Sequence, residues 1–281
     1  MMNEEINCDE RTLSTTKSDD SRNTLPKMQP HLNLLWQYSL IDLNVDSLIE
    51  FQLLLATFCT GLQDAISYPD FRCFASNQTG NTVVLAVGIA NYHYNASKPD
   101  SLFHLPNIAM SLGMFLAGAT ITGQLGNYVG GRRRGWQFIT NLAQTAMIFG
   151  AAGIQYSHDV EETGSWALAV VALLAFSSGA QVAAARAFRV QEITTAMATA
   201  AWVDLVIDPK VLETKNHPRD RRALFLVALI AGAFAGAFMY SKIGSPSALV
   251  LSATGKTLVT AMMLLPKKVP LNHEQSTFAQ C

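Results

Sequence analysis

Long runs without any charged residue constrain this chain more than any other feature of its sequence. Residues 101–131 contain no Asp, Glu, Lys or Arg, and neither do residues 135–158, 163–185 and 223–241. About 20 apolar residues in a helix cross the hydrocarbon core of a bilayer. We therefore expect these four windows to be transmembrane helices of an all-α, polytopic integral membrane protein.

Two further windows are nearly free of charge and bring the expected spans to six. Residues 243–266 are interrupted only by Lys256. Residues 47–68 contain Glu50 near one end and Asp64 near the other. Charges at these depths are tolerated when they face the interior of a helical bundle.

Two apolar segments are too short to cross a bilayer comfortably. Residues 78–91 and 194–207 comprise 14 residues each, and each segment follows a polar stretch. At that length a re-entrant half-helix is as reasonable as a short crossing, provided that the protein shields its open backbone. Two arrangements stay open: six spans with two short re-entrant or half-helices, or eight short spans.

Lysine and arginine concentrate in the cytoplasmic loops of membrane proteins, which favours six spans over eight. With six spans and both termini in the cytoplasm, 16 Lys and Arg residues lie inside and 3 lie outside. With eight spans, 7 of them lie outside. We expect an integral membrane location with cytoplasmic termini, while the sequence leaves open which membrane it is.

The polar ends of the chain do not resemble the membrane domain. Residues 1–46 are expected to form a disordered and interfacial N-terminal tail, because the first 30 or so are polar and contain Pro26 and Pro30. Residues 32–49 suit a helix that lies either on the membrane surface or on the protein itself. The 20 basic and 21 acidic residues nearly cancel, so a nucleic-acid partner is not expected.

The order of hydrophobic segments repeats along the chain: one span, one short segment, then two spans. A shift of 118 residues places Gly61 on Gly179, Gln63 on Gln181 and Gly118 on Gly236. Three spans per half place the halves in opposite orientations, an inverted 3+3 repeat typical of secondary transporters; eight spans would give a parallel 4+4 repeat. The expected regions are the tail 1–46, the membrane repeats 47–157 and 163–266, and a cytoplasmic tail 267–281.

A polar cluster in the first half is a candidate solute site. Gln63 and Ser67 are four residues apart and share a helix face, with Asp64 beside them. Asp64 could take up a proton or bind a cation, or it could cap a helix or pair with an arginine. Residues 77–81 look like the start of a half-helix whose free N–H groups suit an anionic group, or a polar turn between helices.

The second half offers polar residues that could face this cluster. Thr195 and Thr199 could line the same cavity, or bond to their own helix as intramembrane threonines often do. The residues expected to bind the solute are Gln63, Asp64, Ser67, Asn77, Thr79, Gly80, Asn81, Gln181, Thr195 and Thr199.

The first-half motifs carry a family resemblance. Gly61-Leu62-Gln63-Asp64-Ala65-Ile66-Ser67 and Asn77-Gln78-Thr79-Gly80-Asn81 resemble the signature of the YoaK-like family, multi-pass membrane proteins with a domain of unknown function. The resemblance covers roughly residues 50–265 and implies a polytopic membrane domain without an established activity. The second half departs from the pattern, because Val182 stands where the family has Asn and Ala198-Thr199 replaces Thr-Gly.

These features favour a secondary-transporter-like permease for a small solute, with membrane lipid and that solute as partners. The alternative is a membrane scaffold or regulatory protein without transport activity. We expect no enzyme activity, no cofactor and no metal, because no nucleophile–base pair is visible and the 6 histidines lack metal-binding spacing. The sequence leaves a homo-oligomer open.

Overall fold

Helices make up the regular structure in the part of the chain that the structure describes. The structure is a computed structural model that describes residues 38–94, 103–159 and 161–265. Within these ranges lie six long helices and two short ones, α3 and α7, and no strand beyond one isolated bridge. The expected all-α fold is confirmed. The helices are α2 (Ser47–Phe71), α3 (Gln78–Tyr94), α4 (Leu105–Val129), α5 (Arg134–Ser157), α6 (Ser165–Arg186), α7 (Ala198–Val206), α8 (His217–Ile243) and α9 (Ser245–Met262).

Local sequence signals set several helix ends. The Asp46 carboxylate accepts a hydrogen bond from the Ile49 backbone N–H at 3.0 Å and caps the start of α2. Asn216 caps α8 in the same way, accepting from the Arg219 N–H at 3.1 Å. At the other end of α2, Arg72 has a left-handed backbone with φ of 55°, which turns the chain away from the helix axis.

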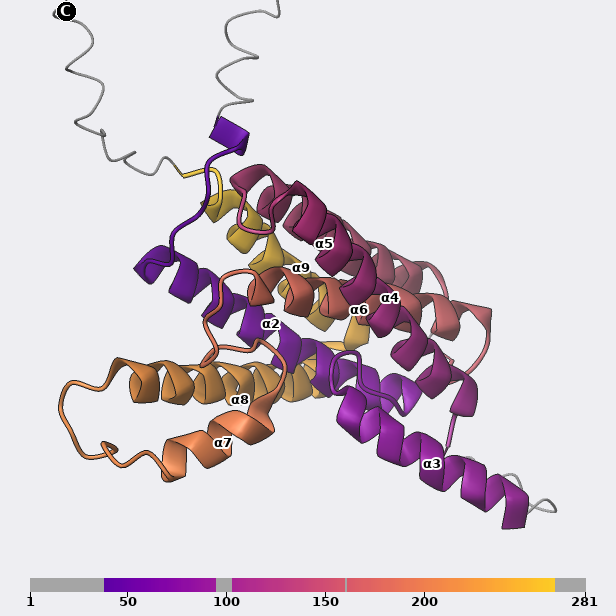
Figure 1. Cartoon of the computed structure of the whole chain (residues 1–281). Coiled ribbons are helices and arrows are strands. Elements are labelled where there is room, and N and C mark those ends of the chain that lie inside the picture. The colour runs from indigo at the N-terminus through magenta and orange to yellow at the C-terminus, as the bar shows by residue number, and fades with distance from the viewer. Residues whose placement is uncertain (1–37, 95–102, 160, 266–281) are drawn as a thin grey trace, which may run out of the picture.

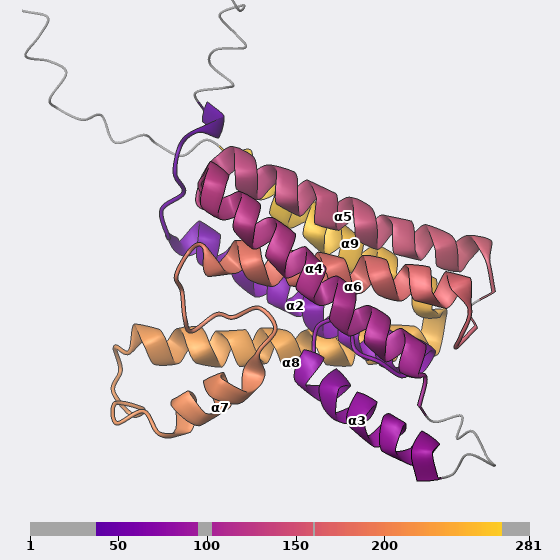
Figure 2. The same ribbon diagram turned by 45° about the vertical axis from the view of Figure 1, so that its right-hand side comes forward.

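Four helices form the centre of the bundle and the others flank it. Helix α5 packs against α6 and α9, and α2 packs against α9 and α6. Helix α4 lies along α6, and α8 lies along α2 (Figures 1 and 2). The short helices are peripheral, since α3 contacts α4 and α7 contacts α8.

The polarity of the bundle is the reverse of that in a soluble domain. On α5, Gln137, Asn141 and Gln144 are buried, whereas Ile139 and Leu142 are at least half exposed. Three described helices, α4, α6 and α8, are long and apolar enough to cross a membrane. Exposed apolar side chains on helices that bury polar ones indicate association with lipid.

The segment before α2 differs from the surface helix expected over residues 32–49. Residues 41–46 lie outside any helix, and Asp42 forms an isolated antiparallel bridge with Arg133. The Leu43 N–H donates to the Arg132 carbonyl at 2.9 Å, and the Arg132 guanidinium donates to the Leu43 carbonyl. The expected helix is therefore wrong for residues 41–46, because the backbone there pairs with the α4–α5 turn. Residues 1–37 and 266–281, which hold most of the expected tails, lie outside the described residues.

The two short segments form helices of unequal length. Helix α3 is 17 residues long, but α7 has only 9. Val83, Val87 and Ile89 on α3 are each between 46% and 59% exposed. The bundle therefore does not enclose α3: these three side chains face the surroundings of the protein, whereas Val84 and Leu85 pack against the core.

Candidate functional site

A buried lysine marks the polar centre of the bundle. Lys256 lies in α9 and is fully buried. Its ammonium group donates hydrogen bonds to Gln144 Oε1 on α5 at 2.6 Å and to Gln181 Oε1 on α6 at 2.8 Å. Among the described residues it forms no salt bridge. Two neutral amide oxygens thus hold a group that is costly to bury in its charged form.

The lysine network continues into α2 through Gln181. Gln181 Nε2 donates to Thr60 Oγ1 at 2.8 Å and to the Ala56 carbonyl at 3.3 Å. Thr60 Oγ1 in turn donates to the same carbonyl at 3.0 Å. One connected set of side chains therefore joins all four central helices.

A second polar contact fixes α2 against α9 one turn away from Lys256. Gln63 Nε2 donates to Ser252 Oγ at 2.8 Å, and both side chains are buried. Gln63 was expected to bind a solute, and in this structure it packs α2 onto α9. Its role in solute binding stays a prediction.

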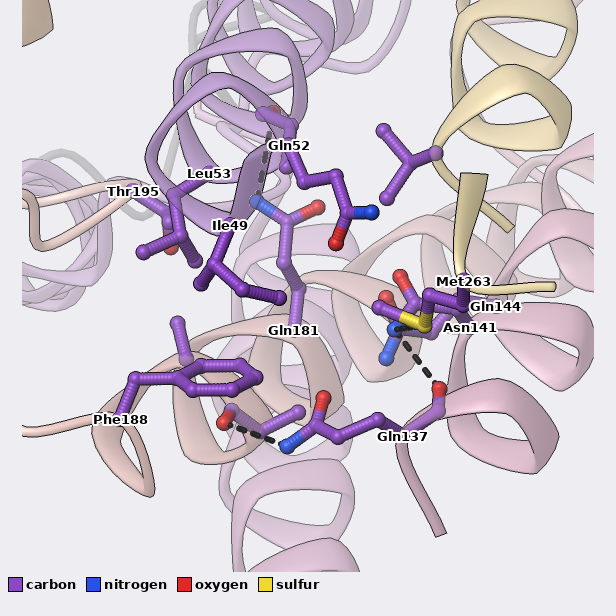
Figure 3. Close-up of a pocket in the computed structure, with 14 residues that line it drawn as sticks. Ile49, Gln52, Leu53, Gln137, Asn141, Gln144, Gln181, Phe188, Thr195 and Met263 are labelled. Carbon is purple, nitrogen blue, oxygen red and sulfur yellow. Dashed lines mark hydrogen bonds between the residues drawn. The ribbon is translucent and has the colours of Figure 1, made fainter. Parts of the chain in front are cut away.

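A small cavity lies beside the lysine network (Figure 3). It is formed by the first half of α2 and α5, the last turns of α6 and α9, and the segment after α6. The volume open to the centre of a water-sized sphere is about 20 Å³, enough for one water molecule. The lining residues are Ile49, Gln52, Leu53, Ala56, Gln137, Asn141, Gln144, Gln181, Ala184, Ala185, Phe188, Thr195, Val259 and Met263.

Three buried polar atoms on this lining have no hydrogen-bond partner in the described part of the chain. They are Gln52 Oε1, Gln144 Nε2 and Thr195 Oγ1. A buried polar group left unpaired costs about 1–3 kcal/mol, so native proteins seldom keep several at one place. Their convergence on one cavity indicates that a water molecule or a bound ligand completes their hydrogen bonds.

The backbone near Thr195 is strained in a way that places this side chain. Thr195 has a φ of 64°, in the left-handed region, and its side chain is fully buried. For a β-branched residue this conformation costs about 1–2 kcal/mol. Such strain clusters at binding sites, where the surrounding structure holds a residue in an unfavourable conformation.

Asp64 and Ser67 lie outside the cavity and hold the connection between α2 and α3. Asp64 accepts hydrogen bonds from the Ser76 N–H at 2.8 Å and the Ser76 hydroxyl at 2.5 Å. Ser67 Oγ accepts from the Ala75 N–H at 3.1 Å. Both carboxylate oxygens of Asp64 thus serve the loop, while a role in proton or cation coupling stays a prediction.

At the start of α3, some polar residues are buried in the protein and others are exposed. Asn81 is fully buried; its amide exchanges hydrogen bonds with the backbone of Phe74 and donates to Gln78 and Ser111. Asn77 is exposed and caps the helix by accepting from the Gly80 N–H at 3.2 Å. Thr79 on α3 and Thr199 on α7 are also exposed.

The structure therefore brings two of the ten predicted residues, Gln181 and Thr195, to the cavity. Sequence reasoning missed Gln144, Gln52 and Lys256. The signal was present, since Lys256 interrupts an otherwise uncharged window. On α5, Gln137, Asn141 and Gln144 recur at helical spacing and share one buried face.

A separate buried carboxylate lies at the opposite end of the bundle. Asp70 at the end of α2 accepts a hydrogen bond from the Ser245 hydroxyl and another, at 3.1 Å, from Gln155 Nε2. These contacts tie α2 to the starting residue of α9 and to α5. In the described ranges, no group of three His, Cys, Asp or Glu side chains could hold a metal ion.

Comparison with known proteins gives one match. A family model described as "Protein of unknown function (DUF1275)" matches residues 52–262. No curated protein and no solved structure matches the chain. The resemblance to an uncharacterised family, expected over residues 50–265, is confirmed at the level of the family.

Proposed function

The chain belongs to the DUF1275 family of proteins of unknown function, and from this premise we propose that it is a multi-pass membrane permease for a small solute. In this proposal six helices cross the membrane, and the solute passes through the cavity beside Lys256. The protein carries solute without chemical change, so it is not an enzyme.

The observation that carries the proposal is the position of the three unpaired polar atoms between the two halves of the chain. Gln52 and Gln144 come from the first half, whereas Thr195 and the neighbouring Lys256 come from the second. In many secondary transporters the solute binds at the interface of two repeats. A cavity with unpaired polar groups at that interface is compatible with alternating access.

Helix lengths favour six spans over eight. The long helices have between 18 and 27 residues, whereas α7 has 9. At about 1.5 Å of rise per residue, α7 is about 14 Å long and cannot cross a hydrocarbon core of about 30 Å. An eight-span arrangement needs α7 as a crossing, so its length argues against that alternative.

The packing pattern supports two equivalent halves. Exchanging α2 with α6, α3 with α7, α4 with α8 and α5 with α9 turns each main packing pair into another observed pair. Thus α4 on α6 becomes α8 on α2, α5 on α6 becomes α9 on α2, and the α5–α9 pair maps onto itself. This is the pattern expected of two repeats related by a pseudo-two-fold axis, and with three spans in each half such a repeat is inverted.

Glycine contacts support the same relation and correct its register. A Cβ atom on Gly118 would overlap the Phe176 carbonyl of α6, and one on Gly232 would overlap the Phe58 carbonyl of α2. Phe58 and Phe176 differ by the expected 118 residues, but Gly118 and Gly232 differ by 114. The sequence overlay of Gly118 on Gly236 is therefore displaced by about one helical turn.

Transport would require the bundle to open. The cavity holds only about one water molecule, so this conformation is closed around it. It lies near the end of the bundle where the Arg132–Arg134 and Arg219–Arg222 clusters gather, the expected cytoplasmic side. Rocking of one half against the other would break the amide contacts across the interface and expose the cavity.

A flux assay with purified protein in lipid vesicles tests the proposal. Vesicles are challenged by osmotic steps of urea, of glycerol, and of potassium chloride or potassium formate with valinomycin. We expect at least one solute to enter faster than into protein-free vesicles, and Gln144→Leu to slow its entry at least tenfold. Gln124→Leu, the same change at an exposed position of α4, should leave entry unchanged.

A scaffold without transport activity is the second candidate. It is favoured by the one-water volume of the cavity and by the close backbone contacts of α4 with α6 and of α8 with α2. If none of the four solutes enters faster than into protein-free vesicles, the permease proposal fails and the scaffold is supported.

A further inference from the structure

We propose that the cavity between α2, α5, α6 and α9 binds one small monovalent anion, of the size of chloride or formate, beside Lys256. The inference rests on the proposed function in that it names the class of solute, or of coupling ion. Binding itself can be measured without transport, so the two ideas can fail separately.

The buried charge of Lys256 favours an anion in the cavity. Lys256 is fully buried, and its ammonium group donates hydrogen bonds to two neutral amide oxygens. None of the residues that line the cavity is an Asp or a Glu. A buried ammonium without a counter-charge costs several kcal/mol, and an anion in the adjoining cavity would remove that cost. Within the described chain, no Asp or Glu carboxylate forms an ion pair with this lysine.

Hydrogen-bond donors outnumber their acceptors at Lys256 and Gln144, which also favours an anion. An ammonium group has three N–H donors, and Lys256 uses two of them. Gln144 Nε2 has two more and no partner. Because Gln144 Oε1 accepts from the ammonium, the amide is polarised and its N–H groups become stronger donors. A ligand that only accepts hydrogen bonds completes this set better than a cation or a neutral donor.

The other two unpaired groups are compatible with an anion. The Thr195 hydroxyl can donate as well as accept. Gln52 presents its oxygen in this structure, and a half-turn of its amide would present N–H donors instead, since the two orientations have the same shape. Three lining side chains can then direct donors at one bound ion, and the charge of Lys256 lies directly behind Gln144 and Gln181, to which it donates hydrogen bonds.

The volume of the cavity limits the size of the anion. A space that accepts about one water molecule admits a monatomic anion or a planar one of three heavy atoms after small side-chain shifts. Sulfate and phosphate are larger and carry more charge than the single lysine balances. The site therefore selects small, singly charged anions.

Thermal unfolding of the purified full-length protein in detergent tests the inference. Potassium chloride or potassium formate replaces potassium gluconate at constant ionic strength, and tryptophan fluorescence reports the melting temperature. We expect a saturable rise of about 4 °C at ten times the dissociation constant for chloride or formate. We expect no such rise when potassium sulfate replaces gluconate.

Two variants identify the residues responsible. Lys256→Met should abolish the rise, whereas Lys242→Met, the same change at an exposed position of α8, should preserve it. Because Lys256→Met can also impair folding, Gln144→Leu provides a second measurement. It keeps the lysine, removes the Nε2 donor together with one acceptor of the ammonium group, and should weaken anion binding at least tenfold.

The possible results distinguish the anion site from the permease. A melting temperature that rises with chloride or formate, without solute flux, supports the anion site and contradicts the permease. Solute flux without such a rise supports the permease and contradicts the anion site. The inference is overturned if chloride and formate act like gluconate on the wild-type protein. It is equally overturned if the rise survives in both Lys256→Met and Gln144→Leu.

Discussion

Buried polar side chains in this protein serve two different purposes at the residue scale. Asn81 satisfies its amide completely with partners in its own loop and on α4, which fixes the α2–α3 connection. Gln144 satisfies only its oxygen. A side chain whose hydrogen bonds are complete stabilises the fold, whereas an incomplete one at a cavity is available to a ligand.

The ion pairs of Glu162, at the end of the bundle far from the cavity, predict a pH dependence. Hydrogen bonding by His104 and the charge of Arg72 hold the pKa of Glu162 below its ordinary value of 4.5. With a depressed pKa, the stabilisation is complete above the ordinary value and is lost as pH falls through the folded-state pKa. Melting temperatures measured from pH 7 down to pH 3 should converge for wild type and Glu162→Gln at the acid end. A constant difference across this range would contradict the role of the ionised carboxylate.

At the scale of the elements, close helix contacts decide which helices lie together. Gly61 on α2 faces the Leu229 carbonyl of α8, and Gly179 on α6 faces the Phe115 carbonyl of α4. Small residues let helix backbones approach closely where lipid offers no hydrophobic drive for association. Gly232 and Gly236 of α8 also lie against the backbone of α2 within the chain.

Gly179→Ala should destabilise the protein because the added methyl group overlaps backbone atoms of α4 that cannot move independently. Overpacking of this kind costs about 1–3 kcal/mol. We expect a clear fall of the melting temperature in detergent. Gly113→Ala is the matched control, because a Cβ atom there meets nothing within 4 Å. Equal melting temperatures for the two variants would contradict the close α4–α6 contact.

The elements also show which parts of the fold the sequence could predict. The uncharged windows predicted all six long helices, since charge-free length is the dominant constraint on a helix in lipid. The uncharged windows did not predict the backbone bridge between Asp42 and the α4–α5 turn. A bridge between two residues that lie far apart in the sequence leaves no periodic pattern along the chain. The short helices were located, but their lengths depend on capping and tertiary contacts that hydropathy does not record.

The candidate site was only partly predictable for a related reason. Local sequence patterns point to polar residues that lie close together along the chain, such as Gln63, Asp64 and Ser67. The cavity instead gathers single residues from four helices and a connection, including Gln52, Gln144 and Thr195. Which of these side chains lack hydrogen-bond partners depends on how the two halves of the bundle pack. No local pattern in the sequence records that packing.

At the scale of the whole molecule, the proposed function requires a bundle whose apolar exterior faces lipid and whose two halves have opposite orientations. The two arrangements considered differ in where the connections lie. With six spans, the α5–α6 connection at Glu161 is outside and the α7–α8 connection at Lys215 is inside. With eight spans, both connections are inside.

Labelling of single cysteines in intact cells, with Cys8, Cys59, Cys73 and Cys281 replaced by serine, therefore tests the central claim most directly. Glu161 and Lys215 are both exposed, so each can be changed to cysteine without disturbing the core. Treatment with a membrane-impermeant maleimide should label Glu161→Cys in intact cells and Lys215→Cys only after the membrane is opened. Labelling of both positions before the membrane is opened would contradict the inverted six-span arrangement. Labelling of neither would contradict it equally when Lys242→Cys, which is exposed and outside in both arrangements, is labelled in intact cells.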